Sequence, residues 1–458
     1  MQTEIIHALG LSVVFVVILM LGECIYRVIA PDNPEISRKS VHFMSGLVSL
    51  SLPYLITSHW LVLLLAAVFM AITVAAKKMG RLKSIHGIGR KSYGAVYFPL
   101  AIYGMFLLGH TKPVLYFISI MVMTVSDSLA ALLGGRYGSI KYDVEGNYKS
   151  LEGSVVFFFV TFLCVHLPLL LMTQAGRLDS VMTAVVIALL ITGFEAVSLA
   201  GSDNIFIPFG TYYILSKKMQ QPLVVSAEDI WKLLFLIAVA VLVAVKSRLW
   251  KPSGLIGMVL INYAAWSLCD IYWFLPLILA QAMLYLLSVY FTKRVEEEIA
   301  GYQIKVFIYS AIVPAIIIFT ANTIDNYATT YIPYLTAVAG QIAIMCYFFM
   351  SIMTDKTNGH LVRLRRNKYL SMVACGITST LGIAALPLFL YFAVSKLSSL
   401  CLVAAGVLIA LCIFHLLMTH YHLRQQMMLR QKMRLVSVGL AAVTTLIIQY
   451  WLGGVLTR

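Results

Sequence analysis

Long apolar runs extend along the whole chain, and short polar segments with clustered lysine and arginine residues separate them. The runs are about 20 residues long, which is the length that an α-helix needs to cross the hydrocarbon core of a membrane. Backbone groups in lipid must be hydrogen-bonded within the protein, and no run alternates like a ten-residue barrel strand, so each run predicts a helix. The runs begin near Ile5, Val41, Trp60, Ala95, Val114, Val155, Val181, Trp231, Leu255, Trp273, Val306, Tyr334, Leu370, Leu397 and Leu435.

Composition agrees with this pattern. Of the 458 residues, 61% are hydrophobic and 12% are charged, and the mean hydropathy is +0.90. These values exclude an ordinary soluble protein. The first run, Met1 to Ile29, contains Glu23 and lacks both a basic leader and a small-residue cleavage site, so we expect a retained span rather than a cleaved signal. The prediction is an all-α, polytopic integral membrane protein with about fifteen or sixteen transmembrane helices.

The net charge of +15 does not indicate a nucleic-acid partner. The cations lie in short loops between spans, where they orient the protein and contact anionic lipid headgroups of the bilayer. The seven cysteines lie in or beside apolar runs without paired ligand spacing, so we expect packing residues rather than a zinc site or disulfides. The sequence gives no indication of oligomeric state.

Loop charges predict the orientation of the spans. The cationic loops at 27–39, 77–91 and 136–149 fall on one side, which the positive-inside rule makes cytoplasmic, with the N-terminus outside. Later cationic loops join them there only if the chain crosses once more between Asp203 and Glu228. The short run Ile205 to Leu215 is the candidate; its eleven residues rise only about 16 Å, so we expect a thinned, tilted or re-entrant segment. Beside Asp203 we expect the helix to be interrupted by irregular backbone that lines the site.

The segment from Ser126 to Ser154 carries the most informative polar residues. Asp127 lies inside an apolar run, where an acid is costly and therefore marks a functional site. We expect the glycines that follow to form turns whose exposed N–H groups bind phosphate oxygens, and nearby cations to neutralise the phosphate charge. An ordinary glycine-rich cytoplasmic turn with orienting cations is the alternative. The predicted phosphate-binding residues are Gly134, Gly135, Arg136, Gly138, Lys141 and Lys149.

Four acids are candidates for a magnesium site. Mg²⁺ prefers oxygen ligands and commonly uses few protein carboxylates together with phosphates and water. Asp127 and Glu152 lie near the same membrane boundary, and we expect both to be catalytic residues as well as ligands. Glu195 and Asp203 complete the predicted metal-binding set, although Glu195 also fits an acid at a helix end that faces water.

A basic cluster occurs at the start of the second span. Arg38 and Lys39 lie close to His42 in a helix, and the three side chains suit a headgroup or a phosphate. Asn204 follows Asp203 and is expected to orient either Asp203 or the ligand.

The motifs, in their order along the chain, resemble those of the CTP-dependent polyprenol and lipid-alcohol kinases. This is the family of dolichol kinase and phytol kinase. The segments that carry the resemblance are Arg38–Gly46, Gly89–Gly94, Ser126–Gly138, Lys149–Ser154 and Glu195 with Asp203–Pro208. Ser150 stands where the family carries Thr or Ser, which implies a nucleotide-binding role. The resemblance implies that the protein uses CTP and Mg²⁺ to phosphorylate the hydroxyl of a membrane lipid alcohol at the cytoplasmic face. The acceptor would be a polyprenol, a phytol-like isoprenoid or diacylglycerol.

Two other functions fit the same residues. A lipid or lipid-phosphate transporter would also combine many spans with a broken helix. A CTP-dependent cytidylyltransferase would use the same nucleotide and metal. The residues themselves do not distinguish CTP from ATP or UTP. The host membrane would be the plasma (inner) membrane in a bacterium and an endomembrane in a eukaryote.

The chain divides into two predicted domains, residues 1–245 with the kinase-like motifs and residues 246–458 with few intramembrane acids. The second resembles the membrane family that contains phytyl-phosphate kinase. That family carries an acidic cluster in a central helix, whereas the corresponding region here, Ala339 to Thr354, offers Gln341 and no acid before Asp355. We therefore expect a degenerate, non-catalytic second domain; an unrelated helical bundle is the alternative.

Overall fold

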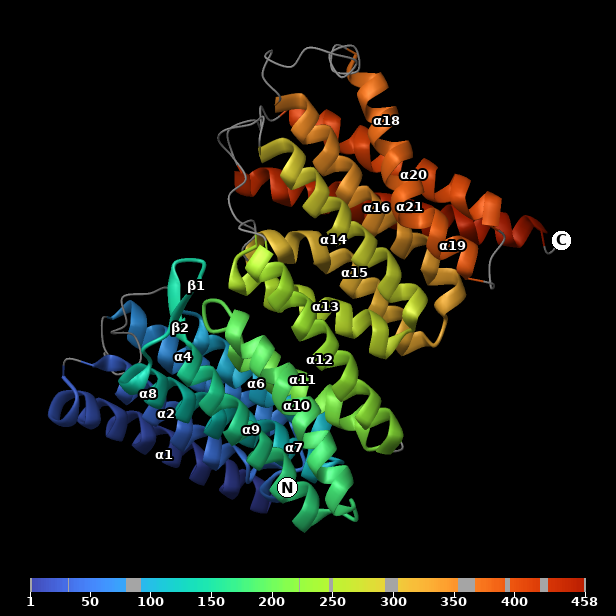
Figure 1. Ribbon diagram of the computed structural model, residues 1–458. Coiled ribbons are helices and arrows are strands. Elements are labelled where there is room, and N and C mark those ends of the chain that lie inside the picture. The colour runs from blue at the N-terminus through green and yellow to red at the C-terminus, as the bar shows by residue number, and fades with distance from the viewer. Residues whose placement is uncertain are drawn as a thin grey trace. The chain divides into compact units, whose positions relative to one another are not determined.

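The chain forms two compact helical units, Met1–Trp231 (unit 1) and Lys232–Arg458 (unit 2) (Figure 1). The computed structural model describes residues 2–31, 33–79, 92–221, 223–246, 250–292, 304–352, 367–391, 396–420 and 427–456. Within these ranges, ten helices are long and apolar enough to cross a membrane, and three shorter helices are also apolar. The prediction of an all-α, multi-pass integral membrane protein is confirmed. The predicted total of about fifteen spans from the apolar runs, and the one further crossing required by the loop charges, stay predictions.

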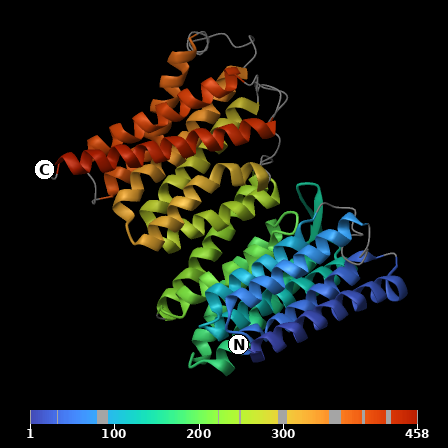
Figure 2. The same cartoon turned by 180° about the vertical axis from the view of Figure 1, so that it is seen from behind.

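Unit 1 is a bundle built around a continuous apolar core that includes Met105, Phe106, Ile118 and Phe157. Its helices are α1 (Gln2–Cys24) with the π-helical η1 (Ile25–Ile29), α2 (Pro34–Ser49), α3 (Leu52–Leu55), α4 (His59–Lys78), α6 (Gly94–Gly109), α7 (Pro113–Met121), η2 (Val122–Ser126), α8 (Asp127–Tyr137), α9 (Leu151–Met172), α10 (Arg177–Val197), α11 (Asp203–Lys218) and the first part of α12 (Leu223–Lys246). Helix α1 lies at the edge of unit 1 in both views (Figures 1 and 2), and only 22% of its apolar window is buried, as expected for a lipid-facing helix.

Helices α7 and α8 are joined without a break by the π-helical turn η2, Val122–Ser126. Such turns occur preferentially at functional sites, and η2 ends directly before Asp127. Helix α2 approaches η2 very closely at Gly46, where an added Cβ would lie 2.1 Å from Thr124 Oγ1. The lack of a side chain at Gly46 therefore allows α2 to lie against the segment that carries Asp127.

A β-hairpin, which the sequence analysis did not predict, connects α8 to α9. Strands β1 (Lys141–Val144) and β2 (Asn147–Ser150) are antiparallel, with Val144 opposite Asn147. The two turn residues, Glu145 and Gly146, have φ angles of 56° and 84°. Two positive φ angles in a two-residue loop are those of a type I′ turn, which matches the natural twist of the strands. The predicted cytoplasmic loop is thus an ordered hairpin.

Helix α11 corrects the expectation of a short or re-entrant segment. It contains 16 residues, which gives a rise of about 24 Å, because Asp203, Asn204 and the residues after Leu215 are also helical. It extends along α6: Asn204 Nδ2 donates to Gly94 O at the start of α6 (3.3 Å), and Tyr212 Oη donates to Leu108 O near its end (2.6 Å). Helix α11 therefore lies along α6 from near the first residue of α6 to near its last. The expected break beside Asp203 is present as the non-helical segment 198–202.

Unit 2 is a second bundle, organised around α16 (Tyr327–Ile352). Of the residues in the most apolar 18-residue stretch of α16, 89% are buried. Helix α16 packs against α14, α15, α18, α20 and α21. The other elements of unit 2 are α13 (Pro252–Leu268), α14 (Ile271–Thr292), α15 (Ile304–Ile324), α18 (Lys368–Thr380), η3 (Leu381–Ala385), α19 (Leu386–Leu390), α20 (Lys396–His420) and α21 (Met427–Leu456).

The division between the units falls within α12, whereas the sequence analysis placed a domain boundary at 245/246, close to the end of that helix. Because α12 continues across the division between the two units, no loop in the sequence marks that division. Gln341 is buried in α16, and Asp355 lies outside the described residues. The degenerate kinase-like character of the second domain stays a prediction.

Candidate functional site

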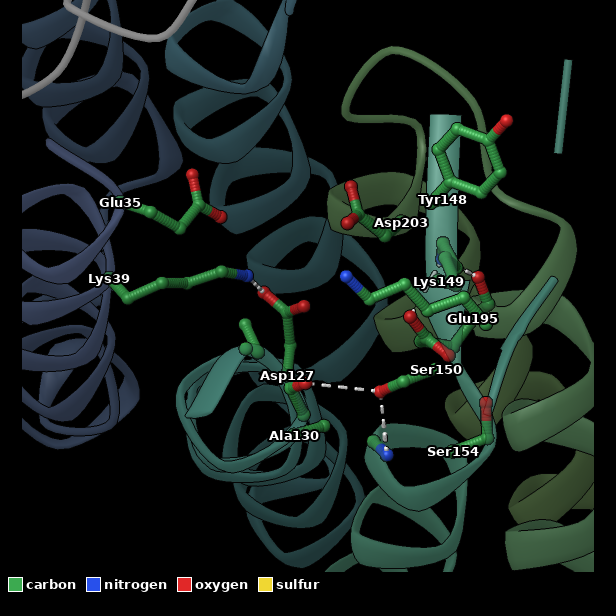
Figure 3. Close-up of a pocket in the computed structure, with 15 residues that line it drawn as sticks. Glu35, Lys39, Asp127, Ala130, Tyr148, Lys149, Ser150, Ser154, Glu195 and Asp203 are labelled. Atoms are coloured by element: carbon green, nitrogen blue, oxygen red, sulfur yellow. Dashed lines mark hydrogen bonds and ion pairs between the residues drawn. The ribbon is translucent and has the colours of Figure 1, made fainter. Parts of the chain in front are cut away.

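A polar cavity of about 280 Å³ lies in unit 1 along α8, where α2, α9 and α11 begin and α10 ends (Figure 3). It brings together nine of the residues predicted from the sequence: Lys39, Asp127, Gly134, Gly135, Lys141, Lys149, Ser150, Glu195 and Asp203. The remaining lining residues are Glu35, Ala130, Ala131, Tyr148, Gly153 and Ser154. Side chains that are more than 150 positions apart in the sequence therefore face one space.

One side of the cavity contains a buried ion pair. Lys39 Nζ lies 2.5 Å from Asp127 Oδ2, and the two residues are only 3% and 5% exposed. His42 is on the same face of α2; its Nε2 lies 3.6 Å from the same Asp127 oxygen and 3.1 Å from Met123 O. The predicted basic cluster and the predicted acid thus form one unit, and the close contact between α2 and η2 holds it together.

A second cation–acid pair lies on the opposite side of the cavity in Figure 3. Lys149 Nζ, from strand β2, donates to Glu195 Oε1 (2.7 Å), to Ser198 Oγ (3.0 Å) and to the Glu195 carbonyl oxygen at the end of α10. Cations near the last carbonyls of a helix are favoured by the helix dipole. Lys149 therefore links the hairpin to the end of α10, and Glu195 is a lining residue rather than an acid at a helix end in water.

Asp203 and Asn204 follow a sharply bent segment. Ala200 and Gly201 have φ angles of 52° and 89°, and a Cβ at Gly201 would lie 2.7 Å from Gly94 N. This close approach joins the Gly89–Gly94 motif to the Asp203 motif. Asp203 Oδ1 accepts from the backbone N of Asn204 (3.0 Å), whereas the Asn204 side chain donates to Gly94 O, so the orienting role expected of Asn204 stays a prediction. Residues 89–91 of the first motif lie outside the described residues.

The glycine-rich segment is a helix and not the phosphate-binding loop that the sequence analysis expected. Gly134 and Gly135 belong to α8, where backbone N–H groups bond to carbonyls four residues earlier. Gly134 instead allows α8 to contact α9: a Cβ there would lie 2.8 Å from Gly153 Cα and 2.9 Å from Ser150 Oγ. Gly138 ends the helix by donating to Gly134 O at 3.0 Å. In membranes, small residues commonly have this packing role.

Ser150 caps α9. Its Oγ accepts from Gly153 N at 3.1 Å and donates to Gly134 O at 3.2 Å. An N-cap hydroxyl satisfies one of the free N–H groups at the start of a helix. Ser150 thus fixes the junction of β2, α8 and α9 and also faces the cavity.

Glu152 and Arg136, both within the described ranges, lie outside the cavity lining. Glu152 accepts from the backbone N–H groups of Ser139 and Ile140 at 2.9 and 3.1 Å, and also from the Ser139 hydroxyl. Arg136 is exposed, and its guanidinium stacks over the Tyr137 ring. The structure gives Glu152 the role of fixing the entry to the hairpin, which the sequence analysis did not foresee.

Glu35, Tyr148 and Ser154 are lining residues that the sequence analysis missed. Glu35 forms an ion pair with Arg38 (2.5 Å) one helical turn away, and Arg38 itself does not line the cavity. That i, i+3 spacing was a visible signal. Ser154 Oγ bonds to Tyr142 Oη at 2.9 Å. Burial, with a further contribution from the Glu195 carboxylate, raises the pKa of Tyr142, so its hydroxyl remains protonated.

The four acids predicted to hold Mg²⁺ are not collected into one ligand set. Asp127, Glu195 and Asp203 line the cavity, whereas Glu152 faces the hairpin. Among the described residues, no group of three or more His, Cys, Asp or Glu side chains is placed to hold a metal ion. The carboxylates of the cavity therefore do not form an all-protein metal cage.

Comparison with known proteins assigns a family. The phytol kinase of Synechocystis sp. (strain ATCC 27184 / PCC 6803 / Kazusa) is 33% identical to this chain over 212 residues, which are 45% of this chain and 89% of that kinase. No family model matches the chain, and no solved structure matches it. The aligned segment extends over nearly all of the relative. Its 212 residues are close to the length of unit 1, which contains every motif residue of the cavity. The chain belongs to the phytol kinase family.

Proposed function

We propose that the protein is an integral-membrane kinase that transfers the γ-phosphate of CTP to the hydroxyl of a membrane lipid alcohol. The observation that carries this proposal is the polar cavity of unit 1, in which the buried Lys39–Asp127 pair faces a second lysine, Lys149, in a member of the phytol kinase family. Phosphoryl transfer depends on positioned phosphates and on charge neutralisation more than on covalent chemistry by the protein. The cavity offers both kinds of group.

Three lysines would bind the phosphates. Lys39, Lys141 and Lys149 come from α2, β1 and β2 and line the same cavity. A lysine ammonium offers charge-assisted hydrogen bonds to phosphate oxygens. In this proposal Lys39 and Lys149 exchange part of their contacts with Asp127 and Glu195 for contacts with the nucleotide, so the two acids keep the lysines oriented before binding.

The donor set of the cavity fits a magnesium ion bound together with a nucleotide. Mg²⁺ commonly uses one or two protein carboxylates plus substrate phosphates, and carboxylates line this cavity without forming an all-protein cage. Asp127 and Asp203 are the side chains that would hold the ion. When bound, the ion would neutralise charge that develops on the transferred phosphate.

The acceptor alcohol would place its hydroxyl beside His42 and Asp127. The Phe98 ring packs edge-on against His42 with 4.9 Å between ring centroids. Phe98 also lines a small apolar cavity of about 30 Å³, together with Phe15 and Phe69. Phe98 thus lies between the His42–Asp127 group and apolar side chains, an arrangement that suits a molecule with a hydroxyl head and a hydrocarbon chain. Polyprenols, phytol-like isoprenoids and diacylglycerol all have this form.

The proposed side of the reaction is cytoplasmic. Helix ends that border the cavity adjoin the cationic loops of the first half, and the positive-inside rule assigns such loops to the cytoplasm. A nucleoside triphosphate is available there.

The test is to incubate purified protein in lipid nanodiscs with Mg²⁺, a panel of lipid alcohols and CTP, ATP or UTP labelled at the γ-phosphate. We expect label in a lipid monophosphate and release of CDP, and no label transfer by the Asp127→Asn variant. Formation of a CDP-lipid with pyrophosphate would instead identify a cytidylyltransferase. Lipid movement across the bilayer without nucleotide turnover would identify a transporter.

A further inference from the structure

Both faces of the β-hairpin contribute side chains to the polar cavity. Directly opposed residues of an antiparallel pair lie on the same face, and residues two apart on a strand share a face. Lys141 is opposite Ser150, and Tyr148 is two residues before Ser150. Lys141, Tyr148 and Ser150 therefore share one face, and all three line the cavity. The other strand face contains Tyr142 and Lys149, which are opposite each other in the ladder, and Lys149 lines the cavity as well.

Tyr148 presents an open aromatic ring at this site. It is 72% exposed although it lines the cavity (Figure 3). Its backbone is held in the ladder opposite Asp143, and the hairpin is fixed at its base by the bond from Leu151 N to Ile140 O at 2.9 Å. Exposed tyrosines at a membrane surface often anchor the protein in the headgroup region, but this ring borders a cavity with three lysines.

The order of groups along β2 matches that of a nucleoside triphosphate. Tyr148 offers an exposed flat ring, Lys149 offers a cation whose side chain is 17% exposed, and Ser150 donates to Gly134 O. Farther inside lies the Lys39–Asp127 pair, which is almost completely buried. A nucleoside triphosphate likewise has an aromatic base at one end and a polyanion at the other. Aromatic side chains stack on bases of any sequence, because every base has a π-face.

We propose that the Tyr148 ring is the stacking platform for the nucleobase of the phosphoryl donor. This assignment rests on the proposed kinase function and adds to it a subsite for the base. The triphosphate then extends past Lys141 and Lys149 toward Asp127. Because stacking tolerates different bases, Tyr148 contributes affinity for the nucleoside and does not select cytosine by hydrogen bonds.

The test compares two probes, CTP and inorganic tripolyphosphate, which share the polyanion and differ in the nucleoside. Their dissociation constants are measured with the purified full-length protein in nanodiscs with Mg²⁺. We expect Tyr148→Ala and Tyr148→Leu to weaken CTP binding by about 5- to 150-fold, the range of one base–aromatic stack, and to leave tripolyphosphate binding unchanged. Tyr148→Phe keeps the ring and should bind CTP like the wild type.

The matched control is Tyr54→Ala, which removes an exposed tyrosine of α3 that lies outside the cavity lining within the described residues. It should change neither constant. Equal losses for CTP and tripolyphosphate, or no loss in Tyr148→Leu, would overturn the stacking role. Failure of the kinase proposal has a different signature: wild-type protein that binds CTP with a Tyr148-dependent affinity but transfers no phosphate to any lipid alcohol.

Discussion

Lys39 and Asp127 are each other's nearest counter-charge, and both residues are almost completely buried. Removing one partner of a buried ion pair leaves the other charge uncompensated and costs about 3–5 kcal/mol of stability, whereas replacing both partners by neutral groups is often tolerated. A single substitution at either position therefore mixes a loss of stability with a loss of chemistry. Comparing a single with a double substitution separates the loss of stability from the loss of chemistry.

We expect Asp127→Asn to lower kcat/KM for lipid phosphorylation at least about 100-fold, because it removes a charge that the transition state requires. The combined variant Lys39→Met/Asp127→Asn should regain most of the stability lost by the single change and remain inactive. Thermal unfolding in detergent and label transfer to lipid measure the two effects. Near-normal turnover in a well-folded Asp127 variant would remove this residue from the catalytic site.

Lys149→Ala should weaken nucleotide binding by about 10- to 150-fold, the loss expected for one charge-assisted hydrogen bond. It also frees Glu195, a further acid in a cavity that binds a polyanion. Lys78→Ala, at the exposed end of α4, is the matched control and should leave affinity unchanged. Isothermal titration with CTP and Mg²⁺ gives both values, and equal affinities for the two variants would exclude Lys149 from the phosphate site.

At the scale of elements, two adjacent glycines of α8 have opposite expected sensitivities. A Cβ at Gly134 would meet the backbone of α9 at 2.8 Å, whereas a Cβ at Gly135 meets nothing within 4 Å. Gly134→Ala should push α8 away from α9 and destabilise the protein by about 1–3 kcal/mol. Gly135→Ala should be neutral or stabilise it by up to about 1 kcal/mol, because glycine is a poor helix former.

Unfolding temperatures and kinase activities of the two alanine variants provide the measurement. If Gly135→Ala abolished nucleotide binding while the protein stayed folded, the segment would have the phosphate-binding role that the sequence suggested. If both substitutions were silent, the close packing of α8 on α9 would be wrong.

The same segment illustrates why some elements are visible in the sequence and others are not. Helices in lipid leave a simple signal, a run of apolar residues of sufficient length, and the runs beginning near Ile5 and Val155 lie within helices α1 and α9. Gly134 was interpreted as a loop residue because glycine weakens helices in water, but in a membrane it also permits close helix contacts. The hairpin sequence contains two lysines and two acids, and its strands have four residues each, so the alternation in Lys141–Val144 is too short to stand out beside the Glu145–Gly146 turn.

For the candidate site, residue types were predictable and pairings were not. Asp127 stood out as an acid inside an apolar run and Lys39 as part of a basic cluster at the start of a span, but their contact joins positions 88 residues apart. Glu35 and Tyr148 were missed because a charged residue near a helix start and a tyrosine near a membrane surface are ordinary features. Only the convergence of α2, the hairpin and α10 makes them part of one cavity.

At the scale of the whole molecule, the orientation of every site residue depends on whether α11 crosses the membrane. Within unit 1, α11 starts beside Gly94 and reaches Leu108, so its two ends lie at opposite ends of α6. Its far end is joined to α12 by a buried ion pair between Lys218 and Asp229. This geometry supports the additional crossing that the loop charges require.

We therefore expect a single cysteine at Gln220, in an otherwise cysteine-free variant, to react with an impermeant thiol reagent added outside intact cells. A cysteine at Asp143, in the hairpin, should react only after permeabilisation, because the hairpin adjoins the cationic side of unit 1. In the second half, Asn326, between α15 and α16, should react from outside, and Asn358, which lies outside the described residues, only after permeabilisation. Labelling of Gln220 and Asp143 from the same side would mean that α11 returns to the side where it began. The cationic loops of the two halves would then face opposite sides of the membrane, and the nucleotide site could no longer be assigned to the cytoplasm from loop charge.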